Sequence, residues 1–239
     1  MRTRVAGVLL AAGEGSRFGQ PKALVKLNGQ TLAERGVNLL RAGGADPILV
    51  VVGAAPVELD GTHTVYNSQW RTGMGSSLRA ALQALADSAD ADSAEAAATS
   101  AEPGTAEPGT AETTIEARSG SDADVGTATG RDVGAVVVAL ADQPLVGAEA
   151  VARLIAAYRD GATVAVAAYD GQARNPVLLA RECWAEVIAM ATGDQGARTF
   201  LRTRPDLVTL VECGDTGRPD DIDTPADLAR ITSAATERA

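Results

Sequence analysis

The chain reads VAGVLLAAGEGSRFGQPK over residues 5–22, an apolar run that leads directly into a glycine-rich loop. This loop matches neither of the two common nucleotide-binding motifs. A Walker loop needs Gly-Lys-Ser/Thr running into a helix, whereas here Pro21 precedes Lys22 and no hydroxyl residue follows the lysine. A Rossmann loop needs the spacing G-x-G-x-x-G, whereas the three glycines here are spaced G-x-G-x-x-x-G with Arg17 inside the turn.

The residues of this loop nevertheless suit a polyphosphate. Gly13 and Gly15 accept positive φ and carry no Cβ, so backbone N–H groups can turn toward an anion. Arg17 adds a two-pronged donor and Lys22 a point charge to the same anion. The alternative is an ordinary glycine-rich turn whose two cations are solvated.

The length of 239 residues allows one large domain or two small ones, and we expect a single domain over residues 1–239. The apolar content of 46% is enough for a sizeable core. Because only 3% of the residues are aromatic, we expect this core to consist of Val, Leu, Ile and Ala. No stretch of 18 apolar residues and no leader sequence is present, so we expect a soluble, cytoplasmic protein that does not bind membranes. Cys183 and Cys213 form neither a disulfide framework nor a metal cluster, and His63, the single histidine, is expected to have no catalytic role.

The net charge of −10 argues against a nucleic-acid partner, but it is concentrated in one segment. Residues 87–132 hold eleven acidic residues and two arginines, whereas the rest of the chain is nearly neutral. This segment is also rich in Ala, Ser, Thr and Gly, and we predict that it is a disordered, low-complexity insertion within the domain. The alternative is a regulatory or partner-binding tail.

Outside this insertion, strand-like and helix-like runs alternate along the chain. Such alternation predicts an α/β fold of three layers, with a mainly parallel sheet covered by helices on both faces. The expected strands are residues 5–11, 47–53, 64–66, 134–140, 163–168, 176–179 and 207–211. The expected helices lie between an N-cap at Thr31 and the glycines at 43–44, over 76–86, up to 158, after 181, after 195 and over 225–231.

Two carboxylates stand where the chemistry of such a sheet is usually placed. Asp142 directly follows five apolar or small residues at the end of the buried strand predicted over 134–140, on the edge where the loop after residue 11 also begins. Asp223 precedes a helix start at Thr224 and Pro225. Two carboxylates together with substrate phosphates and water suit Mg²⁺. The alternative for each aspartate is a helix-capping or turn role.

Four motifs occur in the order found in the MobA-like nucleotidyltransferases. They are LAAGEGSRFGQPK at 10–22, GMGSSL at 73–78, ADQP at 141–144 and DIDTP at 221–225. The chain resembles most closely the molybdenum cofactor cytidylyltransferase branch of that family. The resemblance implies a Rossmann-like fold of the GT-A, nucleotide-diphospho-sugar transferase type. It also implies binding of a nucleoside triphosphate with Mg²⁺ and transfer of the nucleoside monophosphate.

The resemblance also implies roles for individual residues. The catalytic residues would be Arg17, Lys22 and Asp142, and Mg²⁺ would be held by Asp142 and Asp223. The nucleotide would be bound by Leu10, Ala11, Ala12, Gly13, Gly15, Arg17, Lys22, Gly73, Gly75, Ser76 and Ser77. On the acceptor side the implied residues are Asn175, Asp194 and Arg198. Family members more often have histidine at the position of Asn175, which leaves the acceptor open.

The expected reaction is transfer of CMP from CTP to the phosphate of molybdopterin, with release of pyrophosphate. The ADQP motif favours CTP over GTP, and a molybdoenzyme is a candidate recipient of the product. Another phosphorylated acceptor is an alternative. A second alternative is an NAD(P)H-dependent oxidoreductase of the nicotine blue oxidoreductase type, although such an enzyme has no use for the carboxylates at 142 and 223. A third is a non-catalytic insertase for a molybdoenzyme, with residues 87–132 as its docking arm.

Overall fold

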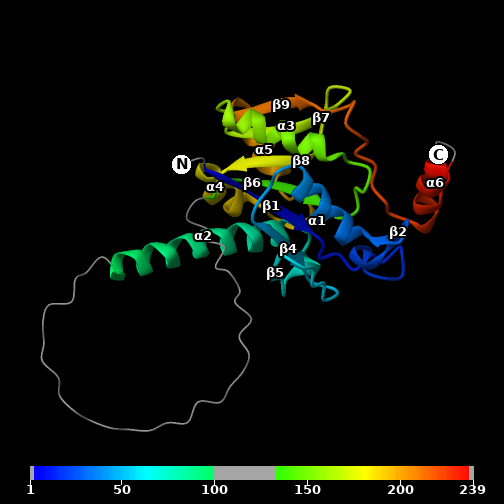
Figure 1. Ribbon diagram of the computed structural model, residues 1–239, viewed down its shortest axis with the longest axis horizontal. Helices are drawn as coiled ribbons and strands as arrows, with labels where there is room; N and C mark the ends of the chain where they lie inside the picture. Colours follow the sequence, from blue (N-terminus) through cyan, green and yellow to red (C-terminus); the bar gives the residue numbers. More distant parts are fainter. Residues whose placement is uncertain (1–2, 100–132, 237–239) are drawn as a thin grey trace, which may run out of the picture.

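The computed structural model describes residues 3–99 and 133–236. A seven-stranded sheet forms the centre of this described part, in the order β5-β4-β1-β6-β8-β7-β9 (Figure 1). The strands are β1 (Arg4–Leu10), β4 (Ile48–Val52), β5 (His63–Tyr66), β6 (Val133–Leu140), β7 (Val164–Tyr169), β8 (Gln172–Ala180) and β9 (Val208–Glu212). Only β8 among them runs antiparallel to its neighbours, β6 and β7. The predicted, mainly parallel α/β sheet is confirmed.

Helices cover both faces of the sheet. On one face lie α1 (Leu32–Ala42) and α3 (Ala148–Arg159), and on the other α2 (Met74–Thr99), α4 (Trp184–Met190) and α5 (Arg198–Thr203). The central strands are apolar on both sides because successive side chains point to opposite faces. In β1, for example, Leu9 packs in the first core and Val8 in the second.

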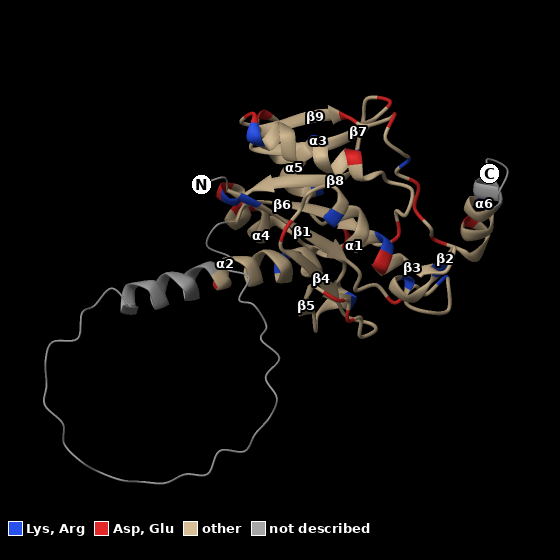
Figure 2. Ribbon diagram, in the orientation of Figure 1, with Lys and Arg blue, Asp and Glu red and all other residues tan. Residues whose placement is uncertain are grey.

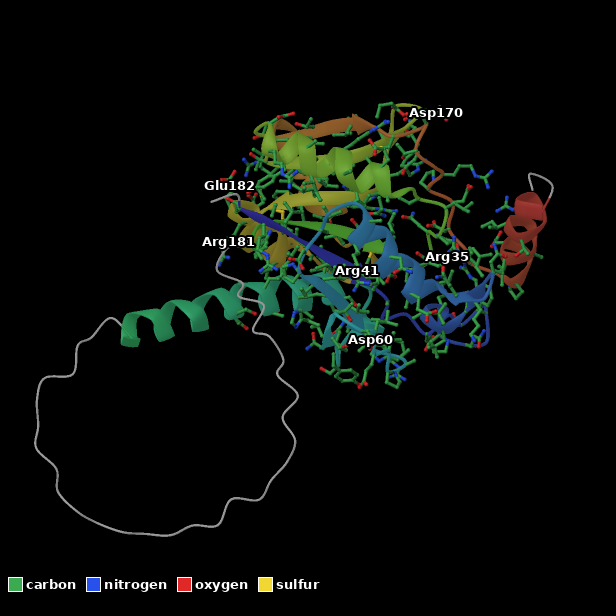
Figure 3. The ribbon with its side chains drawn as sticks, in the orientation of Figure 1. Arg35, Arg41, Asp60, Asp170, Arg181 and Glu182 are labelled. Carbon is green, nitrogen blue, oxygen red and sulfur yellow. The ribbon has the colours of Figure 1, made fainter. Side chains whose placement is uncertain are left out.

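The first helix begins and ends where its sequence indicates. Thr31 accepts a hydrogen bond from the backbone N–H of Glu34 (3.1 Å), and the Glu34 carboxylate accepts one from the N–H of Thr31 (2.6 Å). This reciprocal capping box satisfies two N–H groups at the helix start. Gly43 ends the helix, and Arg41 in its last turn donates to the carbonyl of Asp60 (3.1 Å), which fastens the loop before β5 (Figure 3).

Helix α2 is longer than the helix predicted over 76–86. It begins at Met74 and continues to Thr99, into the segment predicted to be disordered from residue 87. The reason is the alanine content of residues 89–98, since alanine has the highest helix propensity. The remainder of the predicted insertion, residues 100–132, lies outside the described residues.

A small subdomain lies at one side of the sheet. The hairpin of β2 (Lys26–Leu27) and β3 (Gln30–Thr31) packs against α6 (Pro225–Thr236), which stands apart from the sheet in Figure 1. Its apolar core includes Leu27, Ile222 and Ile231. The 3₁₀ turns are η1 (Lys22–Leu24), η2 (Trp70–Thr72), η4 (Arg181–Cys183), η5 (Gly193–Gln195) and η6 (Pro205–Leu207). Within the described residues no helix is long and apolar enough to cross a membrane.

Candidate active site

A cavity of about 230 Å³ opens at the carboxyl ends of β1 and β6. Segments far apart in the sequence meet around it, because the ends of neighbouring parallel strands share one edge of the sheet. It is lined by Leu10, Ala11, Ala12 and Gly13 after β1, Lys22 and Ala23 in η1, Trp70, Gly73, Met74 and Ser77 around the start of α2, Leu140, Ala141 and Asp142 after β6, and Asp194 in η5. The cavity is thus lined by seven of the residues expected to bind nucleotide and by Asp142, which was expected to be catalytic.

Lys22 is the centre of the charged part of this site. Its Nζ donates to Oδ2 of Asp142 (2.9 Å) and to Oδ1 of Asp223 (2.5 Å). These three residues come from the loop after β1, the end of β6 and the connection before α6, which carries several acidic residues and one arginine (Figure 2). The two carboxylates predicted to act together therefore converge on one cation.

Neither carboxylate serves as a helix cap. Helix α3 has Gly147 as its N-cap, five residues after Asp142. At the start of α6, the Asp227 carboxylate accepts from the N–H of Thr224 (2.9 Å), and the Thr224 hydroxyl accepts from the N–H of Asp227 (3.3 Å). The capping alternatives weighed for Asp142 and Asp223 are therefore wrong, and the two side chains remain available to a ligand.

The environment of Lys22 keeps the ammonium charged. Burial by itself lowers the pKa of Lys22, but the charges of Asp142 and Asp223 and the hydrogen bonds to them outweigh that effect and raise the pKa above its ordinary value. The side chain is 20% exposed and that of Asp142 is 25% exposed. The ammonium is thus a fixed positive charge at the mouth of the cavity.

The donor set fits a divalent metal that shares its ligands with a substrate. Asp142 and Asp223 offer hard carboxylate oxygens within reach of one cationic centre, which is the protein contribution that Mg²⁺ usually receives. Within the described residues no three His, Cys, Asp or Glu side chains form a metal-binding group. A metal here would therefore need phosphate oxygens and water to complete its coordination.

The glycine-rich loop has a tight turn at its centre. Gly15 has φ +62°, and a Cβ on it would lie 2.1 Å from the carbonyl oxygen of Gln20, so only glycine fits. Its own carbonyl accepts from the N–H groups of Phe18 (2.7 Å) and Gly19 (3.0 Å). Gly13 does not adopt positive φ, contrary to the reason given for it, but it lines the cavity.

Arg17 lies differently from Lys22. It is exposed on the loop and does not line the cavity. Within the described part of the chain it forms no ion pair or hydrogen bond, which leaves its guanidinium free to turn toward a ligand. The structure thus places Lys22 and the two aspartates together and Arg17 at their periphery.

The glycines at the start of α2 are required by a neighbouring segment of the protein itself. Gly73 has φ +108°, and a Cβ on it would lie 2.4 Å from the carbonyl carbon of Gly193. A Cβ on Gly75 would lie 2.7 Å from the backbone nitrogen of Thr192. Both glycines were expected to bind the nucleotide, whereas the close backbone approach seen at each is to residues 191–194.

Ser76 and Ser77 lie inside α2, one turn from its start. Asn67, which is buried, donates from Nδ2 to the hydroxyl of Ser76 (2.8 Å) and to that of Ser77 (3.0 Å). The Ser76 hydroxyl also donates to the carbonyl of Gly73 (2.8 Å). The helix predicted to begin at Ser76 already begins at Met74.

The residues expected on the acceptor side are divided between two cavities. Asn175 and Arg198 line a second cavity together with Gln143, the residue after Asp142. Asp194 instead lines the first cavity, beside Gly73 and Met74. The segment at 193–198 therefore forms the partition between the two.

Sequence reasoning missed Trp70, which lines the first cavity from η2. Its ring packs closely enough on the backbone after β4 that a Cβ on Gly53 would lie 2.6 Å from the Trp70 Cβ. The guanidinium of Arg71 lies 4.2 Å from the ring centroid. A tryptophan three residues before a glycine motif, in a chain with 3% aromatic residues, was the available signal.

Other sequence predictions concern residues away from the site. Cys183 and Cys213 are both buried and unpaired, and burial raises the pKa of each thiol. His63 is the first residue of the edge strand β5, at the amino end of the parallel strands, whereas the cavity opens at the carboxyl ends of β1 and β6. These three side chains are not among those that line the first cavity.

Ligands of sheets of this kind bind at the edge where the cavity lies, and a cation held between two carboxylates suits a polyphosphate with a divalent metal. The fold and the site together define the α/β nucleotidyltransferase class. Residues 7–208 match the MobA-like NTP transferase domain, and the chain belongs to that family.

Comparison with known proteins gives relatives of more than one activity. The chain is 30% identical over 241 residues to nicotine blue oxidoreductase of Paenarthrobacter nicotinovorans, covering 95% of this chain and 96% of that protein. A probable molybdenum cofactor guanylyltransferase of Opitutus terrae is 49% identical over 47 residues, 20% of this chain and 23% of that protein.

Two solved structures share the fold over nearly the whole chain. A homologue of Mycobacterium tuberculosis Rv0371c from Mycobacterium sp. strain JC1 has a TM-score of 0.68 and 28% identity, covering 100% of both chains. Rv0371c itself, in a complex with manganese, has a TM-score of 0.62 and 22% identity, covering 97% of this chain and 100% of that one.

Proposed function

We propose that the protein is a Mg²⁺-dependent cytidylyltransferase that transfers CMP from CTP to the phosphate of molybdopterin and releases pyrophosphate. The observation that carries the proposal is the position of Lys22, whose ammonium lies between Asp142 and Asp223 at the mouth of the cavity. A cation and two carboxylates in contact form the charge pattern that a metal-bound triphosphate requires.

Different residues of the site would bind different parts of the nucleotide. The backbone after β1 and the turn at Gly15 would bind the phosphates, and Lys22 would exchange its carboxylate partners for phosphate oxygens. Trp70 and Met74 give the cavity an apolar wall, against which a base can pack. Arg17 is free to close over the outer phosphates. Preference for CTP rests on the ADQP motif at 141–144.

The transfer needs no general base. An oxygen of the acceptor's phosphate attacks the α-phosphorus of CTP in line, the α–β phosphoanhydride bond breaks, and pyrophosphate leaves with the bonding electrons. A phosphate monoester is largely ionised at pH 7, so its oxygen is already a nucleophile. This explains why His63 and the two buried cysteines take no part.

Catalysis then consists of positioning and charge neutralisation. Asp142 and Asp223 would hold Mg²⁺, which when bound neutralises charge on the α-phosphate and on the attacking group. The manganese in the Rv0371c complex supports a divalent metal in a protein of this fold. Lys22 orients the phosphates and stabilises charge on the leaving pyrophosphate.

One alternative is favoured by a specific observation, the 30% identity to nicotine blue oxidoreductase over nearly the whole of both chains. An NAD(P)H-dependent reductase would bind its dinucleotide at the same loop. The cluster of Lys22, Asp142 and Asp223 has no evident task in hydride transfer, which is why we place the nucleotidyltransferase first. Transfer to another phosphorylated acceptor uses the same site and is a variant of the proposal.

The proposal is tested by incubating the protein with Mg²⁺, reduced molybdopterin and each nucleoside triphosphate in turn, and measuring pyrophosphate. We expect release with CTP, and a loss of about 10²–10³-fold in the Asp142→Asn and Lys22→Met variants, as for removal of a transition-state donor. Lys26→Met is the matched control, because Lys26 is an exposed lysine four residues further along. Oxidation of NAD(P)H with a dye, and no release from any triphosphate, would overturn the proposal.

A further inference from the structure

The second cavity differs from the first in the charge of its wall. It has a volume of about 810 Å³ and lies on the far side of the partition formed by residues 193–198. Its basic lining residues are Arg174 on β8 and Arg198 and Arg202 on α5, and its one acidic lining residue is Asp221. Three positive charges and one negative charge leave this wall with a charge of +2, in a protein whose net charge is −10.

Within the described residues these arginines differ from others in the protein in having no carboxylate partner. Elsewhere Arg153 pairs with Asp215 (2.7 Å) and Arg204 with Glu186 (2.7 Å). In the part of the chain that the structure describes, none of the three cavity arginines forms an ion pair. Arg202 donates to the side-chain carbonyl of Gln195 (3.1 Å) and Arg174 to the backbone carbonyl of Ala173 (3.0 Å). Most of their donors therefore remain free for an anion.

The remaining wall of the cavity is mixed, with the amides Gln143, Asn175 and Gln195 and an apolar part. Val166, Val177 and Leu201 contribute it from β7, β8 and α5. A ligand with a charged end and a less polar body would satisfy both parts of the wall. Arginine is suited to such a ligand because its planar fork binds phosphate in a bidentate manner and also stacks on flat rings.

We infer that this cavity binds the phosphate monoester of the acceptor through Arg174, Arg198 and Arg202. A phosphate monoester carries a charge of about −1.5 to −2 at pH 7, which matches the +2 of the wall. The inference rests on the proposed function for its description of the ligand as an acceptor. It adds that three arginines, and not Asn175 alone, determine which class of acceptor the protein binds.

The two cavities are placed so that their ligands meet. Gln143 lines the second cavity while its neighbour Asp142 lines the first. In the same way Gln195 lines the second while Asp194 lines the first. The two cavities therefore adjoin at residues 142–143 and 194–195, so that an acceptor in the second would have its reacting end directed toward the nucleotide in the first.

The test uses glycerol 3-phosphate as a monoester probe and glycerol as its uncharged counterpart. The full chain is treated with phenylglyoxal, and modification of each arginine is followed by peptide mass spectrometry at constant ionic strength. We expect the monoester to slow modification of the three cavity arginines at least about threefold, since bound phosphate occupies their donors. Glycerol should have no effect, and Arg159, exposed at the end of α3, should react equally in all conditions.

A variant carrying Arg198→Gln and Arg202→Gln should lose the protection of Arg174, while the Arg159→Gln control should retain it. Equal protection of Arg159, or no protection of the cavity arginines, would overturn the inference. CTP binding, measured by calorimetry in the same variants, should stay within about twofold, because neither arginine lines the nucleotide cavity. Failure of the wild-type protein to bind CTP would contradict the proposed function and leave the arginine result standing on its own.

Discussion

Replacing Lys22 by methionine should free the carboxylates of Asp142 and Asp223 to bind a metal ion in place of the ammonium. The variant keeps most of the side chain's length but leaves Asp142 and Asp223 facing each other without their shared cation. Removing one partner costs about 3–5 kcal/mol for a buried pair, whereas an exposed pair is worth about 0–1 kcal/mol. The side chains of Lys22 and Asp142 are 20% and 25% exposed and that of Asp223 is 48% exposed, so the cluster lies between these limits.

We therefore expect the free energy of unfolding of Lys22→Met to fall by about 2 kcal/mol without metal. Urea denaturation followed by circular dichroism measures it, with Lys26→Met as the control that should change little. Adding Mg²⁺ should then stabilise Lys22→Met more than the wild type, because the metal no longer competes with an ammonium. At a concentration tenfold above its dissociation constant the gain is about 1.4 kcal/mol.

Two outcomes would refute this reasoning. In one, Lys22→Met loses no more stability than Lys26→Met, which would mean that the cluster contributes nothing to folding. In the other, Mg²⁺ stabilises the wild type and Lys22→Met equally, or still stabilises a Lys22→Met, Asp142→Asn double variant. Either of these two results with Mg²⁺ would show that the two carboxylates are not the metal ligands.

Further predictions concern the surroundings of the site. Gly73→Ala should lower the free energy of unfolding by about 2 kcal/mol and Gly44→Ala by only about 1 kcal/mol, because both have positive φ but only a Cβ at 73 meets backbone. Phe200→Ala, at a side chain 1% exposed, should cost about 3–5 kcal/mol in thermal or urea unfolding. Deleting residues 88–131 should leave turnover within about threefold, because the entropic cost of connecting two segments changes only slowly with the length of chain between them; a larger loss would assign that segment a function.

The charged cluster was predictable from sequence for a simple geometric reason. Asp142 directly follows a strand of valines, and Lys22 follows the loop after another strand of the same parallel set. Parallel neighbours end at the same edge, so their following residues meet there. The motif before α6 was harder to place, because only the folded chain brings Asp223 to within 2.5 Å of Lys22.

Other features depend on contacts between segments that are distant in the sequence, and the local sequence patterns do not predict them. The reversed direction of β8 is set by its pairing with β6 and β7, whereas its sequence reads like any buried strand. The glycines at 73 and 75 are fixed by residues 191–194, which only the fold brings next to them. Helix α2 extends past its predicted end because alanines favour helix whether or not they can be buried.

The arginines of the second cavity were partly visible in the sequence. Arg198 lies in a segment that resembles the acceptor side of the family, whereas Arg174 and Arg202 lie in no motif. They reach the same cavity because β8 and α5 both contribute to its wall, and their lack of carboxylate partners among the described residues is a property of the folded surface. Local sequence cannot show which charges remain unpaired.

The central claim is tested most directly by following the α-phosphorus of CTP. The protein is incubated with Mg²⁺, reduced molybdopterin and CTP labelled at the α-phosphate, and the products are separated. The account predicts that the label moves into a covalent adduct with the acceptor, that pyrophosphate is unlabelled, and that Lys22→Met slows the transfer about 10²–10³-fold while Lys26→Met does not. Label that stays entirely in CTP, in a protein that oxidises NAD(P)H in the presence of a dye, would contradict it.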